Sequence, residues 1–447
     1  MTVENNTKKT VATTDGLAGT ADPVTSTMQL FTEVPGFTAL SFATAAAFGA
    51  FSLMLPVIPL AVILTTGSDT LAGATTMVFM AVTVATQLVT NRIIRRYGYR
   101  RVMLAAAFLL GVPTLWYLVS MDTASLLLVA AVRGMGFGSL CVAQFALVAH
   151  IALVAHIAPP GALGKASGII GLFTGAAQMV GLPAGLWLSE HVGNSVVFIA
   201  GALVALVAAG LAVLIHNPAP EPVISRPKPP LEHGRKQLRM REKLRGGTLW
   251  VLAAPAVAMT TVAMGYGALS SFLPATVKDV DPVQGASFAG LLLAVVGGAQ
   301  MIARYVCGAW ADRVGKPGSL MFVGQGLVIA SLVGMVGIIS GGLPLGWLLV
   351  SATLFGCGFG FVSTEAMLEM FMRVPRGRIG QASTVWNAAF DTGTGSGAIL
   401  LGLVAAWQGY TAIFLVSALV VIVGAIAEIG DRRGRRRALS RGGKSVF

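Results

Sequence analysis

Charged residues are scarce in this chain. They make up 11% of the 447 residues, and the mean hydropathy is +0.78, whereas soluble globular proteins carry about 25% charged residues. Long apolar runs are abundant instead. A helix needs ~20 apolar residues to cross about 30 Å of hydrocarbon, where an unpaired backbone amide finds no partner. The composition therefore excludes an ordinary soluble domain and predicts an integral membrane protein.

Cysteines and enzyme motifs are scarce as well. Cys141, Cys307 and Cys357 are the three cysteines, and each stands in an apolar run. We therefore expect small hydrophobic side chains and no disulfide framework. The chain has five histidines and contains no HExxH motif, no GxSxG motif and no P-loop. The sequence thus disfavours a membrane-embedded enzyme or an ATP-driven pump, and we expect neither a metal nor a cofactor.

Twelve apolar runs are long enough to span a membrane, so the predicted fold class is all-α. We expect spans at roughly 37–62, 71–91, 102–120, 124–149, 166–188, 194–215, 248–274, 285–307, 318–340, 344–371, 380–405 and 409–429.

Positive charges orient these spans, because Lys and Arg accumulate in cytoplasmic loops. With both termini cytoplasmic, the inner loops and tails hold 28 of the 31 Lys and Arg residues, and the outer loops hold only Lys278. The remaining two, Arg133 and Arg304, fall inside predicted helices. This asymmetry predicts a multi-pass protein with both ends inside, and we expect it in the plasma membrane of a bacterium. It also explains the net charge of +13 without a nucleic-acid partner.

The chain divides into two halves that resemble each other. Three landmarks recur at nearly constant separation: Gly98 matches Gly315, Gly138 matches Gly360, and Gly164 matches Gly380. The duplication predicts two pseudo-symmetric six-helix bundles with a substrate site between them near the membrane midplane. The expected segments are a disordered tail (1–35), a first bundle (36–215), a cytoplasmic linker (216–247), a second bundle (248–429) and a basic tail (430–447).

The separation shrinks by six positions between the second and the third landmark, so the first half holds six extra residues there. They coincide with the tandem hexapeptide ALVAHIALVAHI at 146–157. We interpret it as an insertion that lengthens the cytoplasmic end of the fourth span.

The segment GAWADRVGK, at 308–316, resembles the loop signature of the major facilitator superfamily, and the similarity extends over about 36–430. In that family the loop clamps neighbouring helices when the transporter is open to the outside, which implies this role for Gly308, Asp312, Arg313 and Gly315. The first-half copy, NRIIRRYGYRR, has Asn91 and Arg95 in place of the motif's Gly and Asp, so that clamp is not carried over.

Three shorter segments resemble the same family. AAVRGMGFG, at 130–138, is similar to its fourth-span motif, whose arginine is tied to proton coupling. GLPAGLWL, at 181–188, resembles the fifth-span antiporter motif, although Leu182 splits the expected Gly-Pro pair. This similarity implies a helix bend at Gly181, Pro183 and Gly185. AAFDTGTGSG, at 388–397, resembles the eleventh span of efflux permeases of the sugar and opine exporter-like branch.

Asp391 is an acid near the middle of its predicted span. A charge at that depth costs ~2.5–3.5 kcal/mol on insertion scales, so this carboxyl should face a cavity, find a partner or be protonated. A group that takes up and releases a proton as water access alternates suits ion-coupled transport. The alternative is a neutral acid bonded to a backbone carbonyl near Gly393, Gly395 and Gly397.

Arg133 lies equally deep in the fourth span and must stay charged. The first six predicted spans contain no Asp or Glu, so its partner comes from the other half, from substrate, or from backbone carbonyls. Together with Asp391 it predicts an electrically polarised cavity that suits a zwitterionic or amphoteric solute.

Other polar residues extend this candidate site. Glu365 and Glu369 share a helix face at spacing i, i+4, and they are either further proton carriers or a structural pair with Arg373. Further cavity candidates, each of which could equally form a helix-to-helix hydrogen bond, are Asn387, Gln144, Gln178 and Gln300.

These features predict a secondary active transporter, a proton-coupled exporter of a small organic solute that works by alternating access. The export direction rests on the family resemblance, and an uptake symporter is the main alternative. A sensor is disfavoured because the segments outside the membrane are short. The expected partners are a small-molecule substrate, protons and membrane lipid, and we expect the chain to act as a monomer.

Overall fold

The computed structural model describes residue 31 and residues 36–154, 162–215, 231–314, 318–374 and 379–440. All elements in these ranges are helical. They are α2 (Phe37–Met54), α3 (Val57–Thr66), α4 (Asp69–Tyr97), α5 (Tyr99–Gly111), the 3₁₀ helix η1 (Val112–Leu118), α6 (Thr123–Val154), α7 (Ala162–His191), α8 (Asn194–Val213), α9 (Leu231–Val280), α10 (Gly285–Val314), α11 (Met321–Ser340), the 3₁₀ helix η2 (Leu345–Trp347), α12 (Leu348–Met372), α13 (Ile379–Gln408) and α14 (Tyr410–Ser440).

Within the described ranges, twelve helical segments are long and apolar enough to cross a membrane. This confirms the predicted all-α membrane fold. The first and third spans differ from continuous α-helices. The first breaks at Leu55 and Pro56, between α2 and α3, because proline has no amide hydrogen to donate to the helix. The third tightens into η1 at Pro113.

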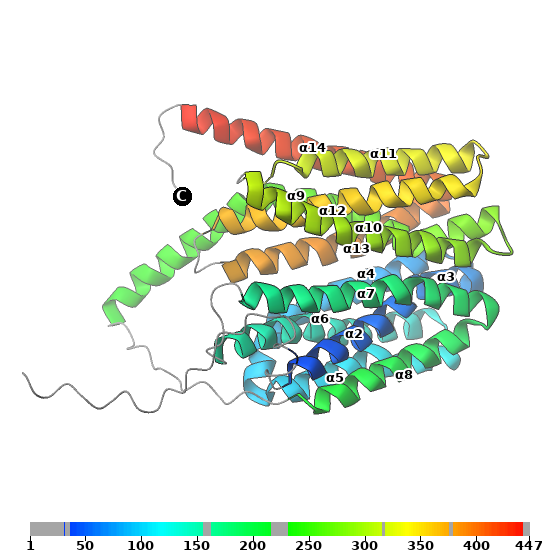
Figure 1. Cartoon of the computed structure of the whole chain (residues 1–447), viewed down its shortest axis with the longest axis horizontal. Helices are drawn as coiled ribbons and strands as arrows, with labels where there is room; N and C mark the ends of the chain where they lie inside the picture. Colours follow the sequence, from blue (N-terminus) through cyan, green and yellow to red (C-terminus); the bar gives the residue numbers. More distant parts are fainter. Residues whose placement is uncertain are drawn as a thin grey trace, which may run out of the picture.

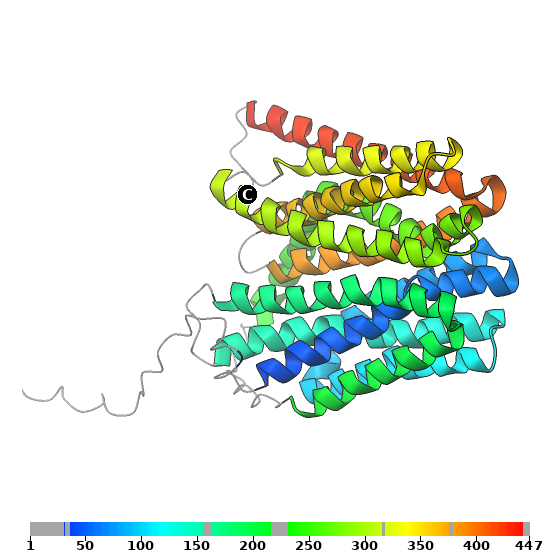
Figure 2. The same ribbon diagram turned by 45° about the vertical axis from the view of Figure 1, so that its right-hand side comes forward.

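The spans pack as two groups, which are called here the first half (α2–α8) and the second half (α9–α14). In Figures 1 and 2 the first half, blue to green, lies below the second half, green to red. Across the boundary α4 packs along α13, and α7 packs along α10. Consecutive spans alternate in direction because short connections force antiparallel neighbours. We call the end where α2 begins and α14 ends the proximal end, and the opposite one the distal end.

Two helices reach into segments that the sequence assigns to the linker and the basic tail. α9 begins at Leu231, inside the predicted linker, and α14 continues to Ser440, inside the predicted tail. Figure 1 shows the first part of α9 projecting past the bundle at the proximal end. The first tail (1–35) lies outside the described residues except for Phe31. The hexapeptide repeat is helical as far as Val154, and 155–157 lie outside the described ranges.

Small residues set the closest helix contacts between the halves. A Cβ on Gly73 of α4 would lie 2.2 Å from the carbonyl oxygen of Ala398 on α13. That separation is shorter than any real contact, so only glycine permits this approach. A lipid-embedded interface gains little from the hydrophobic effect and relies instead on such close van der Waals packing. The glycines near Asp391 pack as closely, because a Cβ on Gly393 or Gly397 would lie 2.5 or 2.2 Å from a backbone oxygen of α9.

Candidate functional site

Asp391 lies at the boundary between the halves. It sits ten residues into the span Gln381–Gln408, which places it about 15 Å deep at 1.5 Å per residue. Its side chain is buried, at 4% exposure, and its Oδ2 accepts a hydrogen bond from Nε2 of Gln87 on α4 at 2.8 Å. Among the described residues no cation forms an ion pair with it. The carboxyl thus joins the two halves through a neutral amide, at a depth where its charge is costly.

The distal end of this boundary is held closed by polar contacts between the halves. Glu190, near the end of α7, accepts hydrogen bonds from the backbone amides of Ala286 (3.3 Å) and Ser287 (2.7 Å) at the start of α10. The Ser287 hydroxyl also donates to it. These amides belong to the first turn of the helix, where no intrahelical acceptor exists. The acid therefore caps a helix of the opposite half, and we call this contact the Glu190 latch.

Two further hydrogen bonds reinforce the distal closure. The Tyr410 hydroxyl donates to Oδ1 of Asp69 at 3.0 Å, joining α14 to α4. The hydroxyls of Thr76 and Ser271 lie 3.4 Å apart, joining α4 to α9. The described cross-boundary hydrogen bonds therefore lie at the distal end or, for Asp391, near the middle of the membrane.

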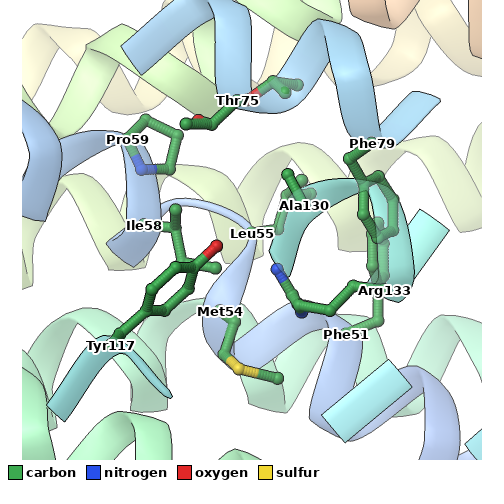
Figure 3. A pocket seen from close by; sticks show the side chains of 11 residues that line it. Phe51, Met54, Leu55, Ile58, Pro59, Thr75, Phe79, Tyr117, Ala130 and Arg133 are labelled. Atoms are coloured by element: carbon green, nitrogen blue, oxygen red, sulfur yellow. The ribbon is translucent and has the colours of Figure 1, made fainter. Parts of the chain in front are cut away.

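Arg133 lies inside the first half, next to a small pocket (Figure 3). Its side chain is 5% exposed. Its Nε donates to the Leu110 carbonyl at 3.1 Å, and the guanidinium lies 5.4 Å from the centre of the Phe79 ring. Figure 3 shows the Tyr117 hydroxyl on the opposite wall of the pocket. One carbonyl, one aromatic face and one hydroxyl thus surround a permanent cation, in agreement with the backbone-carbonyl alternative left open by the sequence.

The pocket beside Arg133 is small in this conformation. The space left in it is about 20 Å³, enough for about one water molecule. Its lining comes from α2, α3, α4, η1 and α6 of the first half: Phe51, Met54, Leu55, Ile58, Pro59, Thr75, Thr76, Phe79, Tyr117, Ala130 and Arg133. Asp391 is not among these residues. This pocket therefore does not hold both charges that the polarised-cavity hypothesis places together, and that hypothesis stays a prediction.

The family model of the Major Facilitator Superfamily matches residues 40–384. The chain belongs to that superfamily.

Relatives and solved structures agree with this assignment. An uncharacterized MFS-type transporter of Salmonella typhimurium is 25% identical over 259 residues, which are 57% of this chain and 59% of that protein. The match thus spans less than two thirds of the relative's length. In fold, the nucleoside transporter NupG superposes with a TM-score of 0.68 at 12% identity, over 88% of this chain and 99% of NupG.

A second solved transporter shares the fold to the same degree. The peptide transporter POT superposes with a TM-score of 0.69 at 14% identity, over 91% of this chain and 98% of that one. The chain is therefore a multi-pass membrane protein of this superfamily.

The two glutamates of the tenth span lie in a network at the proximal end of the second half. Glu365 is fully buried and accepts hydrogen bonds from the amides of Gly318 and Leu320, the latter at 2.9 Å. Glu369 forms an ion pair with Arg373 at 2.6 Å. Arg373 also pairs with Asp431 of α14 at 2.9 Å. These contacts favour the structural alternative for Glu369, and they give Glu365 backbone partners within its own half.

The remaining polar candidates are scattered over several helices. Asn387 donates to the Ser383 carbonyl within α13 at 2.9 Å. Gln144 is 1% exposed, and its Oε1 has no hydrogen-bond partner among the described residues. Gln178 on α7 and Gln300 on α10 are half-buried. Their role in a cavity stays a prediction.

The loop motif at 308–316 falls partly outside the described residues. Gly315 lies in the gap at 315–317, and the side chain of Asp312 is likewise not described, whereas Gly308 is half-buried and Arg313 is exposed. The clamp therefore stays a prediction.

In the fifth span, Gly181 and Gly185 provide close contacts, and the helix bend expected at these residues and Pro183 stays a prediction. A Cβ on Gly185 would lie 2.1 Å from the Leu53 carbonyl oxygen of α2. Pro183 faces α10, where a Cβ on Gly290 would lie 2.9 Å from its Cα.

Two boundary residues, Gln87 and Glu190, escaped the sequence reasoning, and Arg304 was noted there without a role. Nothing in the sequence marked Gln87 or Glu190 as functional. Glutamines are common in contacts between transmembrane helices, and Glu190 lies at a helix end, where acids are common. Arg304 did carry a signal, since it lies inside a predicted span just as Arg133 does. The internal duplication also relates Arg304 to Gln87, the partner of Asp391.

Proposed function

We propose that this transporter is a proton-coupled exporter in which Asp391 carries the coupling proton. The observation on which this rests is the hydrogen bond between Asp391 and Gln87, which joins α13 to α4 across the boundary of the halves. Alternating access requires the halves to move against each other around a central site. A protonatable group in the contact between them is in a position to sense that motion.

The coupling follows from how a hydrogen bond depends on charge. A bond to an ionised carboxylate is roughly twice as strong as one between neutral groups. The ionised form of Asp391 therefore holds α4 and α13 together more strongly than the protonated form. Proton uptake by Asp391 weakens this contact, and loss of the proton restores the contact. Because linkage is reciprocal, separation of the halves in turn changes the affinity for the proton.

Charge placement supports a cytoplasmic proximal end. Lys and Arg concentrate at this end, whereas the distal end holds only Lys278, in the last turn of α9, and positively charged ends face the cytoplasm. With the Glu190 latch closed, the conformation is then shut toward the outside. The site would exchange solute and protons with the cytoplasm in this state.

Export rather than uptake is supported by the resemblance of AAFDTGTGSG to efflux permeases of the sugar and opine exporter-like branch. Arg133 is assigned a supporting role in this proposal. It holds a fixed positive charge that links α5, the Phe79 ring of α4 and its own helix α6. The retained alternative is a proton-coupled uptake symporter of a small metabolite.

The test begins with metabolite profiling of cells with and without the protein. Export predicts that the solute accumulates inside cells that lack the transporter, and depletion would favour uptake. The identified solute is then used in proteoliposomes with an imposed pH gradient. Asp391→Asn and Arg133→Ala should each abolish proton-driven flux while the protein still inserts into the membrane.

Matched controls separate a site effect from a general loss of charge. Asp279→Asn removes an exposed carboxyl at the distal end, and Arg101→Gln removes an exposed guanidinium at the proximal end. Both controls should retain wild-type flux. Wild-type flux in Asp391→Asn as well would remove the proton role proposed for this acid.

A further inference from the structure

Arg304 of α10 is a second intramembrane cation, and it differs from Arg133 in being half-buried rather than sealed. It sits ten residues before the end of α10 at Val314, about 15 Å along the helix axis. Its pseudo-symmetric counterpart in the first half is Gln87, because the two are separated along the chain by the same interval as the landmark pair Gly315 and Gly98.

The position opposite Arg304 lacks an acid. Gln87 meets Asp391 across the boundary. The counterpart of Asp391 in the first half, by the interval between Gly380 and Gly164, is Gly175 on α7. The nearest atom to a Cβ on Gly175 would be the Met301 sulfur, 3.4 Å away and one turn before Arg304 on α10. In the pseudo-symmetric contact between α10 and α7, the donor Gln87 is therefore replaced by the cation Arg304. The acceptor Asp391 is replaced by Gly175, which has no side chain.

The guanidinium of Arg304 is fixed in direction but not neutralised. Its Nε donates to Oγ of Ser363 on α12 at 3.2 Å. Among the described residues, Ser363 is the hydrogen-bond partner of the Arg304 side chain, and no described acid forms an ion pair with Arg304. A guanidinium has five N–H donors in a rigid planar fork that matches a carboxylate. The terminal nitrogens thus remain available to a ligand.

Ser363 also fixes an aromatic wall beside this cation. Its backbone carbonyl accepts a hydrogen bond from Nε1 of Trp386 on α13 at 2.9 Å. The Trp386 ring stacks on Phe390 with an interplanar angle of 7° and a centroid separation of 6.2 Å. The ring of Phe390 in turn packs against the ring of Tyr266 on α9, with their centroids 6.2 Å apart. One serine therefore sets the direction of both a cation and an indole.

We propose that Arg304 and Trp386 form the substrate subsite of the second half, and that they bind a small aromatic carboxylate. The carboxylate of the solute takes the place that Asp391 occupies in the other copy of the contact, and pairs with the guanidinium fork. The aromatic ring of the solute packs against the indole, which gives stacking energy beyond its buried area. Trp386 is half-buried, so part of its surface is free for such a contact.

This inference rests on the proposed transport function and names its substrate class. We expect the solute to reach this subsite from the proximal end, because most of the described cross-boundary hydrogen bonds lie toward the distal end. In this inference the two charged residues have different roles: Arg304 binds the solute, and Asp391 carries the proton.

The test measures direct binding to the purified full-length protein in lipid nanodiscs. Benzoate is the probe, benzamide is its uncharged match, and cyclohexanecarboxylate is its non-aromatic match. We expect benzoate to bind more tightly than either. Arg304→Gln should weaken benzoate binding about 10- to 100-fold, since bonds to charged groups contribute about 1.5–3 kcal/mol. It should leave the weak binding of benzamide unchanged.

Further variants separate the cation from the ring. Trp386→Leu should remove the preference for benzoate over cyclohexanecarboxylate. Arg304→Lys keeps the charge and loses the planar fork, so an intermediate affinity is expected. The controls are Arg101→Gln and Trp407→Leu, which alter an exposed arginine and an 86% exposed tryptophan. Both should bind benzoate as the wild type does.

Two results would overturn the subsite. One is the absence of benzoate binding to the wild type, and the other is wild-type affinity in Arg304→Gln. Each leaves the transport proposal standing if Asp391→Asn still abolishes proton-driven flux. Conversely, benzoate binding that depends on Arg304, combined with wild-type flux in Asp391→Asn, would support the subsite and remove the proton role of Asp391.

Discussion

Glu190→Gln should shift the transporter toward a conformation open at the distal end. The carboxylate of Glu190 accepts three hydrogen bonds from Ala286 and Ser287, two of them from first-turn amides of α10. A negative charge there also interacts favourably with the positive end of the helix dipole. The glutamine keeps one acceptor oxygen and the length of the side chain, but it loses the charge and turns an NH₂ group toward other donors.

The size of the shift follows from these contacts. Bonds to a charged group contribute about 1.5–3 kcal/mol each, and those between neutral groups about 1 kcal/mol. Glu190 is half-buried, so solvent screens part of the difference. A net loss of about 2 kcal/mol is reasonable, which multiplies the ratio of distal-open to distal-closed molecules by about 30.

Distances between spin labels measure this ratio. Labels at Val119 and Val283, which are 76% and 77% exposed in distal loops of the two halves, report the opening after the three native cysteines are replaced. Glu190→Gln should populate a longer distance that is minor in the parent. Asp279→Asn, which removes an exposed distal carboxyl, is the control. A distance distribution that matches the parent in Glu190→Gln would refute the latch.

Three further predictions test the packing and the loops. Gly73→Ala should separate α4 from α13, because its Cβ would lie 2.2 Å from a backbone oxygen of Ala398. Such overpacking costs about 1–3 kcal/mol, and a thermal unfolding temperature equal to that of wild type would contradict this prediction. Arg373→Ala should destabilise the second half by about 3 kcal/mol, because buried Glu369 loses its cation; an unchanged midpoint of denaturant-induced unfolding would argue against this. Asp122 caps the first turn of α6, and its hydrogen bonds with Ser120 and Ser125 lower its pKa to about 2. Because the pKa is lowered in the folded state, this cap contributes stability that is complete above the unfolded pKa of about 3.9 and is lost as the pH falls toward 2. Amide exchange at 123–125, corrected for intrinsic rate, should therefore stay slow from pH 8 to 5 and accelerate only in acid. Acceleration that begins near neutral pH would count against the cap.

The sequence predicts the spans well because lipid imposes one strict condition on them. A spanning segment must satisfy its own backbone and present apolar side chains, and both properties are visible without tertiary contacts. Helix breaks are less visible. Pro56 splits the first span into α2 and α3, whereas Pro183 lies within the continuous helix α7. The outcome at each proline depends on packing with neighbouring helices.

The candidate site was only partly predictable for a related reason. The cost of an isolated charge is a local property, so Asp391 and Arg133 stand out in the sequence. Which helix faces which is a global property. The sequence could not show that Asp391 meets Gln87, that Arg133 turns into the first half, or that Arg304 shares Ser363 with Trp386. The internal duplication was the one available signal, because it pairs Arg304 with Gln87.

The most direct test of the account asks whether Asp391 links protonation to the motion of the halves. Spin labels at Tyr97 and Met372, which are exposed at the proximal end of the first and second half, report that motion without knowledge of the substrate. In the cysteine-free parent, the distance distribution should change between pH about 5.5 and about 8. In Asp391→Asn it should be the same at both pH values. A pH-dependent change of parental size in Asp391→Asn would contradict the central claim.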